Sequence, residues 1–364
     1  MSKHLVAHVG FHKTGTTSLQ ASFAANRDIL KAQGVVYPKL GSKAHHRAAW
    51  ALIGRTWGWK NRGGRTYPIS EWKKLVSSIN KNRRTTLISS EFFCELSEEQ
   101  INRFREDIKA DQVTIVFTIR PLVKLLRSSY QQYLKYGLTP TYDEWLHSVL
   151  DEPGVSKITP TFWKRHDHAN VISQWAKVFG AQNVVVVVAN EREPEAIFAT
   201  FNEILQLPAN TLKQPKGISS NRSLTFEEVS LLLEVNKNFP KSRDWSDYEV
   251  YIREGAIKHL TDNVPISEGD EQLLTPAWAV EKARAISTKS VETIKGYGAR
   301  VIGDLDVFGS AQVPVGENSP VLSVSLSTAA QALLAMNRDL LDLHSSRLIF
   351  KIALKRIKSK IPFI

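Results

Sequence analysis

The chain has 364 residues, of which 42% are apolar and 23% charged, so it is long enough for one large folded domain or two smaller ones. Its formal charge of +12 predicts anionic partners, while the absence of a zinc-ligand spacing, a helix-turn-helix signal or an aromatic RNA-binding signature speaks against nucleic acid. The single cysteine, Cys94, excludes an intramolecular disulfide framework. No apolar run reaches about 18 residues and no signal peptide is evident, so a cytoplasmic protein without a transmembrane helix is expected.

Residues 5–20 predict a short strand, a glycine-bounded loop and the start of a helix. Gly10 and Gly15 have the spacing of a nucleotide-binding P-loop, but Thr16 stands where such a loop has its lysine. The lysine lies inside the loop instead, as Lys13. Backbone N–H groups and the positive end of the helix would meet at this loop, which suits a phosphate or a sulfate.

Helices and strands alternate along the next two hundred residues. The patterns predict helices at 17–33, 44–54, 70–82, 97–110, 121–136, 142–151, 162–179 and 194–206, and strands at 35–37, 85–90, 113–119 and 184–188. Thr17 and Gln20 have the spacing of a capping box, as do Ser97 and Gln100. The continuous apolar runs at 113–119 and 184–188 are typical of buried parallel strands.

This alternation predicts an α/β fold with a central parallel sheet flanked by helices. After residue 208 the strand pattern fades, and helices are predicted at 225–238, 246–262, 271–296 and 327–343. We therefore expect an α/β nucleotide-binding core over 1–225 and a mainly helical C-terminal extension over 226–364. Ligands of such sheets bind at the carboxyl ends of the strands, where Lys13, Glu91 and Arg120 would meet.

Two polar segments have no certain role. Residues 39–69 combine tryptophans, arginines and glycines, which suits either contact with a sugar or anionic acceptor or a loop whose tryptophans pack inward. Arg165-His166-Asp167-His168 lacks the partners of a metal site and is expected to be a solvated helix face.

The stretch Gly-Phe-His-Lys-Thr-Gly-Thr-Thr-Ser-Leu-Gln at 10–20 resembles the 5′-phosphosulfate-binding loop of sulfotransferases that use 3′-phosphoadenosine-5′-phosphosulfate (PAPS). The resemblance implies that Lys13 is catalytic, stabilising charge on the departing phosphate, and that no metal is required. It also implies a set of donor-binding residues in the loop: Gly10, His12, Lys13, Thr14, Gly15, Thr16 and Thr17.

Two later segments extend the resemblance. Arg120 and Ser128 stand at the spacing of the sulfotransferase element that binds the 3′-phosphate, and an arginine can pair bidentately with phosphate. Residues 216–224, which include Asn221, resemble a loop that closes over the nucleotide in bacterial sulfotransferases. A polar loop before a helix is the alternative interpretation of that segment.

The acceptor base is left open among four residues. Related enzymes use either a glutamate or a histidine, and Glu91 follows a predicted strand in a segment that loosely resembles glycan sulfotransferases. Glu91 and His46 rank close together, followed by His45 and then His12.

The predicted function is sulfuryl transfer from PAPS to a hydroxyl or amine, with a glycan or glycolipid as the expected acceptor. A P-loop kinase or NTPase is one alternative, although the lysine after Gly15 is absent, and a non-catalytic nucleotide-binding module is another. The basic and apolar segment 347–364 could contact an anionic membrane, or pack against its own domain or a partner. The oligomeric state stays open.

Overall fold

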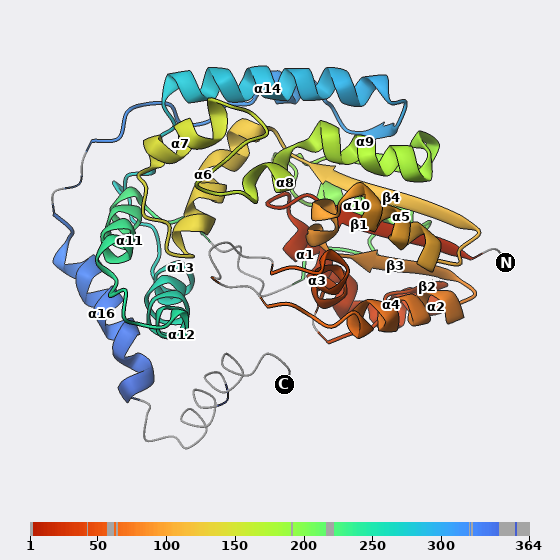
Figure 1. Cartoon of the computed structure of the whole chain (residues 1–364), viewed down its shortest axis with the longest axis horizontal. Helices are drawn as coiled ribbons and strands as arrows, with labels where there is room; N and C mark the ends of the chain where they lie inside the picture. Colours follow the sequence, from red (N-terminus) through yellow and green to blue (C-terminus); the bar gives the residue numbers. More distant parts are fainter. Residues whose placement is uncertain are drawn as a thin grey trace. The chain divides into compact units, whose positions relative to one another are not determined.

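A sheet of parallel strands forms the centre of the chain in a computed structural model (Figure 1). The structure describes residues 3–41, 43–56, 62, 65–190, 192–215, 222–319, 321, 323–341 and 354. Across these residues the sheet has six strands in the order β2-β3-β1-β4-β5-β6, and every neighbouring pair is parallel. The strands are β1 (His4–Gly10), β2 (Val35–Val36), β3 (Thr85–Ser89), β4 (Gln112–Ile119), β5 (Val184–Val188) and β6 (Arg300–Ile302). The predicted α/β fold class is therefore confirmed.

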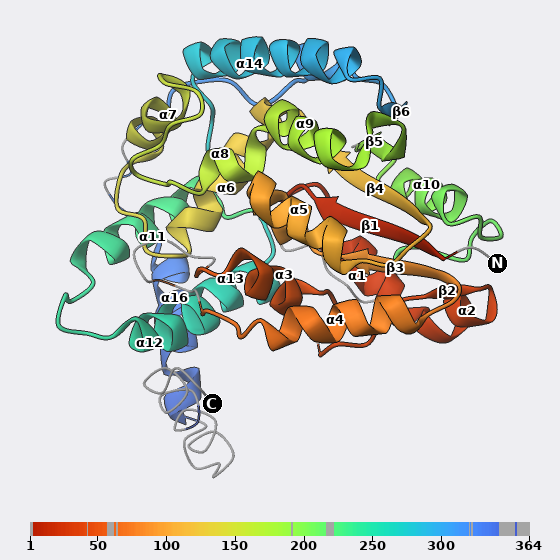
Figure 2. The same cartoon turned by 45° about the vertical axis from the view of Figure 1, so that its right-hand side comes forward.

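Both faces of the sheet are buried, which explains its continuous apolar strands. Side chains alternate along β1, so that Leu5, Ala7 and Val9 enter one core while Val6 enters the other. Helices cover both faces (Figure 2). The first core includes side chains from α3 (His46–Ile53), α4 (Ser70–Lys81), α5 (Glu98–Asp107), α9 (His168–Phe179), α14 (Ala277–Gly296) and α15 (Val307–Ser310). The second includes side chains from α1 (Thr16–Ala25), α2 (Arg27–Ala32) and α10 (Ala196–Ile204).

Several predicted elements differ in detail from those observed. The helix predicted over 17–33 is divided at Asn26 into α1 and α2, and the one predicted over 162–179 is divided at Asp167 into α8 (Phe162–His166) and α9. The elements that were not predicted include the 3-10 helix η1 (Glu91–Glu95), the short helix α15 and the edge strand β6. The capping box of Ser97 and Gln100 is confirmed at the start of α5. A short 3-10 turn, η2 (Ala181–Asn183), precedes β5.

The chain forms two compact units whose ranges interleave. The first comprises 1–126, 146–218 and 277–313, and the second comprises 127–145, 219–276 and 314–364. Two helices contribute residues to both units, α6 (Leu122–Leu134) and α7 (Tyr142–Leu150).

Helices make up the second unit, as the sequence predicts for much of this region. They are α11 (Phe226–Asn238), α12 (Trp245–Asp247), the π-helix η3 (Tyr248–Ile257), α13 (Lys258–Asn263) and α16 (Leu326–Leu341). Ala256, Leu260 and Ala332 form its small apolar cluster between η3, α13 and α16. Among the described residues, no helix combines the length and apolarity needed to cross a membrane. The segment 347–364, where membrane contact is one prediction, lies outside the described residues except for Leu354.

Candidate functional site

Hydrogen bonds connect the loop after β1 to the end of the neighbouring strand β4. Phe11 donates its backbone N–H to the carbonyl of Thr118 at 2.8 Å. The buried Thr14 hydroxyl donates to the Phe11 carbonyl at 2.7 Å and lies 2.7 Å from the Thr118 hydroxyl. These bonds fix the loop at the carboxyl end of the sheet, where parallel α/β folds bind ligands.

Three residues of the loop adopt left-handed backbone conformations. Gly10 has φ 128°, Lys13 has φ 64° and Gly15 has φ 87°. A Cβ at Gly10 would lie 3.2 Å from the carbonyl oxygen of Glu91, so glycine also permits a close approach to η1. The conformation of Lys13 costs about 1 kcal/mol or more, and such strain persists where surrounding structure holds it, often at functional sites.

The N-terminus of α1 is open to an anion. Gly15 is its N-cap, its first turn has no acidic residue, and no side chain in the described part of the chain caps it. The first N–H groups and the helix dipole therefore favour a negative ligand. The capping box predicted for Thr17 and Gln20 was wrong, because the helix begins earlier and the Gln20 side chain bonds elsewhere.

Arg120 lies beside the loop. It follows β4 directly, and its Nη1 donates to the Lys13 carbonyl over 3.4 Å. The first two sequence motifs thus meet at adjacent strands of the sheet. Ser128 lies on α6 in the second unit, and Asn221 lies outside the described residues, so their donor contacts remain predictions.

Glu91 follows β3, on the other side of β1, and begins η1. Gln20 of α1 donates to its Oε2 at 2.8 Å, and Nδ1 of His46 is 3.7 Å from the same oxygen. Burial raises the pKa of the Glu91 carboxyl, but His46 and His12 outweigh this effect, and the net pKa lies below the ordinary value. Glu91 is therefore a carboxylate at neutral pH and can accept a proton.

The two neighbouring histidines of the α3 start have different environments. His45 is buried, its Nδ1 accepts from the Ser89 N–H at 3.1 Å and its Nε2 donates to the Pro38 carbonyl at 2.9 Å. Burial lowers its pKa to about 4. His46 is less buried and its Nδ1 lies 2.9 Å from the Ser90 hydroxyl. Because both ring nitrogens of His45 are bonded to the backbone, this geometry favours His46 over His45 on the acceptor side.

A series of buried polar contacts connects the end of β4, next to the loop, with Glu91. His8 in β1 is fully buried, and its ring nitrogens lie 2.9 Å from the Ser89 hydroxyl and 3.2 Å from the Thr118 hydroxyl. Burial lowers the pKa of His8 to about 4, so the ring is neutral at physiological pH. Gln20 donates to Ser89 over 3.3 Å as well as to Glu91.

A second glutamate, which the sequence interpretation missed, lies at the end of η1. Glu95 is paired with Arg55 at 2.7 Å and with Arg165 at 2.8 Å, and His12 of the loop is 3.4 Å away. Its apolar neighbours in the sequence, from Phe92 to Leu96, are the one local signal that could have indicated a buried carboxylate.

The expectation of a solvated face at residues 165–168 was wrong. His166 and His168 are buried, and the His168 ring packs 4.4 Å from the Phe11 ring in the loop. Burial lowers the pKa of His168 to about 3. The two histidines of this segment are therefore buried, and His168 packs against the loop rather than facing solvent.

Aromatic side chains surround the Glu91–His46 pair. Phe92 packs against His46 and Trp50, at ring distances of 5.1 and 4.9 Å. Trp50 stacks on Tyr67 at 5.2 Å, and the Arg47 guanidinium lies 6.0 Å from the Tyr67 ring. Trp57 and Trp59, which the sequence also singles out, lie outside the described residues.

Comparison with known proteins finds similarity to solved structures. No protein-family model and no curated protein matches the chain. A crystal structure of a sulfotransferase from Alicyclobacillus acidocaldarius is similar with a TM-score of 0.40 and 18% identity, over 65% of this chain and 92% of that chain. Both the score and the identity are low, so the proposals below rest on this chain's own residues.

Proposed function

We propose that the chain is a sulfotransferase that moves a sulfuryl group from PAPS to a hydroxyl or amine of an acceptor. The observation that carries this proposal is the strained Lys13, held between two glycines at an open helix N-terminus with the Arg120 guanidinium at its carbonyl. A loop with its lysine inside, rather than after the second glycine, departs from the pattern of a magnesium–triphosphate site. A second cation beside it suits a nucleotide that carries two separate phosphate groups.

On this proposal the loop and Arg120 hold the anionic donor. The backbone N–H groups at the start of α1, with Thr16 and Thr17, bind the 5′-phosphate, and Arg120 and Ser128 bind the 3′-phosphate. The Lys13 ammonium stabilises the negative charge that develops on the departing phosphate, which is electrostatic catalysis.

The acceptor side of the reaction is assigned to Glu91 with His46 beside it. The acceptor oxygen attacks sulfur, the bond between sulfur and the bridging oxygen breaks, and adenosine 3′,5′-bisphosphate leaves. The acceptor proton passes to the Glu91 carboxylate, which the lowered pKa keeps unprotonated at neutral pH. Gln20 and His46 hold that carboxylate in place from two helices.

The proposed acceptor is a carbohydrate or glycolipid. Trp50 and Tyr67 are half-buried stacked rings beside the Glu91–His46 pair, and Arg47 adds a cation at their edge. Such rings pack against the apolar face of a sugar while the polar groups bind its hydroxyls.

Calorimetric titration of the full chain tests the donor assignment. We expect adenosine 3′,5′-bisphosphate to bind without magnesium, and labelled PAPS to pass sulfate to members of an oligosaccharide panel. Binding of ATP only with magnesium, and none of the bisphosphate, would support a kinase or NTPase instead. Bisphosphate binding with no transfer to any acceptor would favour a non-catalytic module.

Replacing Lys13 tests the chemical assignment. Lys13→Met keeps the length of the side chain and removes its charge, so transfer should fall by about 10²–10³-fold while the fold stays intact. Lys31→Met, at an exposed position of α2, is the matched control and should retain full activity. Equal transfer rates in the two variants would contradict the role of Lys13.

A further inference from the structure

Glu95 is a fully buried carboxylate directly behind the loop. Its side chain has 0% exposure, Nη2 of Arg55 lies 2.7 Å from Oε2, and Nε of Arg165 lies 2.8 Å from Oε1. Burial raises the pKa of the Glu95 carboxyl, but Arg165, His12 and Arg55 outweigh this and hold it well below its ordinary range. Glu95 is therefore a permanently ionised carboxylate. If the two arginines were removed, its negative charge would stay buried without compensation.

His12 contacts this carboxylate from the loop. Its Nε2 is 3.4 Å from Glu95 Oε1, and within the described chain this buried nitrogen has no hydrogen bond of ordinary geometry. The ring packs edge-on against Phe92 at 4.8 Å and its side chain is only 12% exposed. The imidazole is thus held by contacts with the Glu95 carboxylate and the Phe92 ring.

Charged groups on α8 and η1 shift the pKa of His12 in opposite directions. Burial lowers its pKa most strongly, Arg165 of α8 lowers it further, and Glu95 and Glu91 of η1 raise it. His166 of α8 is a nearby ring as well, since His12 contributes to lowering its pKa. The net pKa of His12 lies below its ordinary value, so the ring is neutral in the protein without ligand.

A neutral ring that offers Nε2–H to Glu95 carries a lone pair on Nδ1, which repels an anion. A phosphate entering the loop adds negative charge close to the ring and favours the imidazolium, with a proton on each nitrogen. We propose that His12 takes up a proton when the donor phosphate binds, and that Glu95 is the positioning residue that holds the protonated ring. This inference rests on the proposed donor site and adds to it a linkage between binding and protonation.

The linkage predicts the direction of the pH dependence. Because the bound state holds one more proton than the free state, affinity rises as pH falls through the pKa of His12 in the complex. The ligand's own phosphates protonate with pKa values of about 6 and would weaken binding at lower pH. Because the ligand's phosphates are the same in every titration, comparing the unmodified chain with His12→Gln at one pH isolates the proton taken up by His12.

Calorimetric titration with adenosine 3′,5′-bisphosphate, in two buffers of different ionisation enthalpy at one pH, counts the protons taken up. We expect uptake in the unmodified chain and its loss in His12→Gln, whose amide keeps a donor toward Glu95. Glu95→Gln should reduce the uptake and weaken binding by about tenfold, the equivalent of one unit of pKa. His4→Gln, a histidine at the start of β1 whose Nε2 lies 2.9 Å from the Thr114 hydroxyl, is the matched control and should leave uptake unchanged.

Each outcome decides one claim. No binding of the bisphosphate to the unmodified chain would overturn the proposed function together with this inference. Binding with equal proton uptake in the unmodified chain and His12→Gln would overturn the linkage and leave the function standing. Unchanged uptake in Glu95→Gln would overturn its positioning role. If Glu95→Gln fails to fold, Glu95→Asp keeps the charge but withdraws it by one methylene, and uptake should fall in that variant instead.

Discussion

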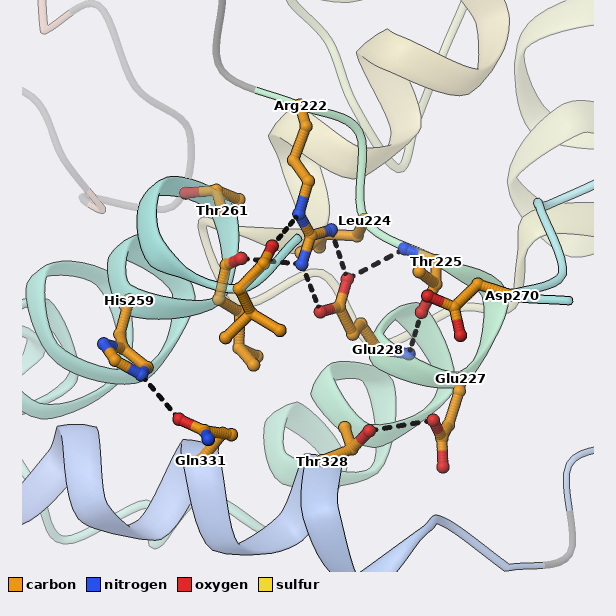
Figure 3. Close-up of polar contacts among 12 residues, drawn as sticks. Arg222, Leu224, Thr225, Glu227, Glu228, His259, Thr261, Asp270, Thr328 and Gln331 are labelled. Carbon is orange, nitrogen blue, oxygen red and sulfur yellow. Dashed lines mark hydrogen bonds and ion pairs between the residues drawn. The ribbon is translucent and has the colours of Figure 1, made fainter. Parts of the chain in front are cut away.

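Two helical segments, η1 in the first unit and α11 in the second, each begin at a capped residue and each hold a glutamate against arginine. At the start of α11, Thr225 and Glu228 form a capping box. Arg222 binds both oxygens of Glu228, at 2.6 and 2.7 Å, and also donates to the carbonyls of Leu260 and Val264 (Figure 3). The ion pair and the cap are therefore bonded to each other at the start of α11.

η1 also has a capping residue and glutamates, but their side chains contact several other segments of the chain. Its cap, Ser90, accepts from the Phe92 N–H and also lies 2.9 Å from His46. Its first and last residues, Glu91 and Glu95, contact side chains from α1, α3, α8 and the loop after β1. Two of these contacts, from His46 to Glu91 at 3.7 Å and from His12 to Glu95 at 3.4 Å, are ion-pair contacts rather than hydrogen bonds.

On our proposal, this difference separates a structural glutamate in α11 from functional glutamates in η1. A buried carboxylate whose oxygens are all bonded within its own helix start stabilises the fold and has nothing left to exchange. A carboxylate that contacts residues from distant segments fixes the relative positions of those segments, and on our proposal Glu95 holds the His12 ring while its Nδ1 takes up a proton as the donor binds. Substitutions in both segments test whether they differ in this way.

The largest effect is expected at Glu91. Glu91→Gln preserves shape but cannot accept a proton, so sulfate transfer should fall by about 10²–10³-fold with bisphosphate affinity unchanged. Since the pKa of Glu91 is lowered, the carboxylate form persists at lower pH, and the unmodified chain should keep its rate as pH falls toward about 4, the ordinary range of a carboxyl.

Assays of transfer against pH check this expectation. Glu98→Gln, a glutamate of the first turn of α5, is the matched control. His46→Gln should lose less activity than Glu91→Gln, because it removes a neighbour rather than the base. A larger loss in His46→Gln than in Glu91→Gln would assign the base to the imidazole instead.

The framework of the site is predictable because its residues follow strands. Lys13, Glu91 and Arg120 come directly after β1, β3 and β4, whose apolar runs are visible in the sequence, and parallel strands bring their carboxyl ends together. β6 is not predictable in this way. Its three residues are partly exposed at the edge of the sheet, and only pairing with β5 identifies it as a strand.

The second layer of the site depends on contacts that no local pattern encodes. Glu95 and Arg165 are 70 positions apart, and a polar segment such as 165–168 has the composition of a solvent face. Burial of His166 and His168 follows from packing against the loop and its neighbours, which is a tertiary property. Periodicity can therefore indicate the strands that carry a site, but not which distant charges pair behind it.

An intermediate effect is expected at the Arg222–Glu228 ion pair at the start of α11. Glu228→Gln leaves the Arg222 guanidinium without its carboxylate, and breaking such a buried pair should lower the free energy of unfolding by about 3 kcal/mol. Urea denaturation of the full chain measures this loss. Proton uptake on bisphosphate binding should match that of the unmodified chain. A loss of uptake would show that the two segments are not functionally different, and would break the comparison.

The smallest effect is expected at the cap of the same helix. The Thr225 hydroxyl accepts from the Glu228 N–H at 3.2 Å, so Thr225→Ala should cost about 1 kcal/mol of unfolding free energy, the ordinary value of one N-cap. Ser90→Ala removes the corresponding cap of η1, where the hydroxyl also contacts His46. It should cost a similar free energy but lower sulfate transfer as well. Equal activity in both alanine variants would contradict a functional role for the η1 cap, because it would mean that Ser90, like Thr225, only caps the start of a helix.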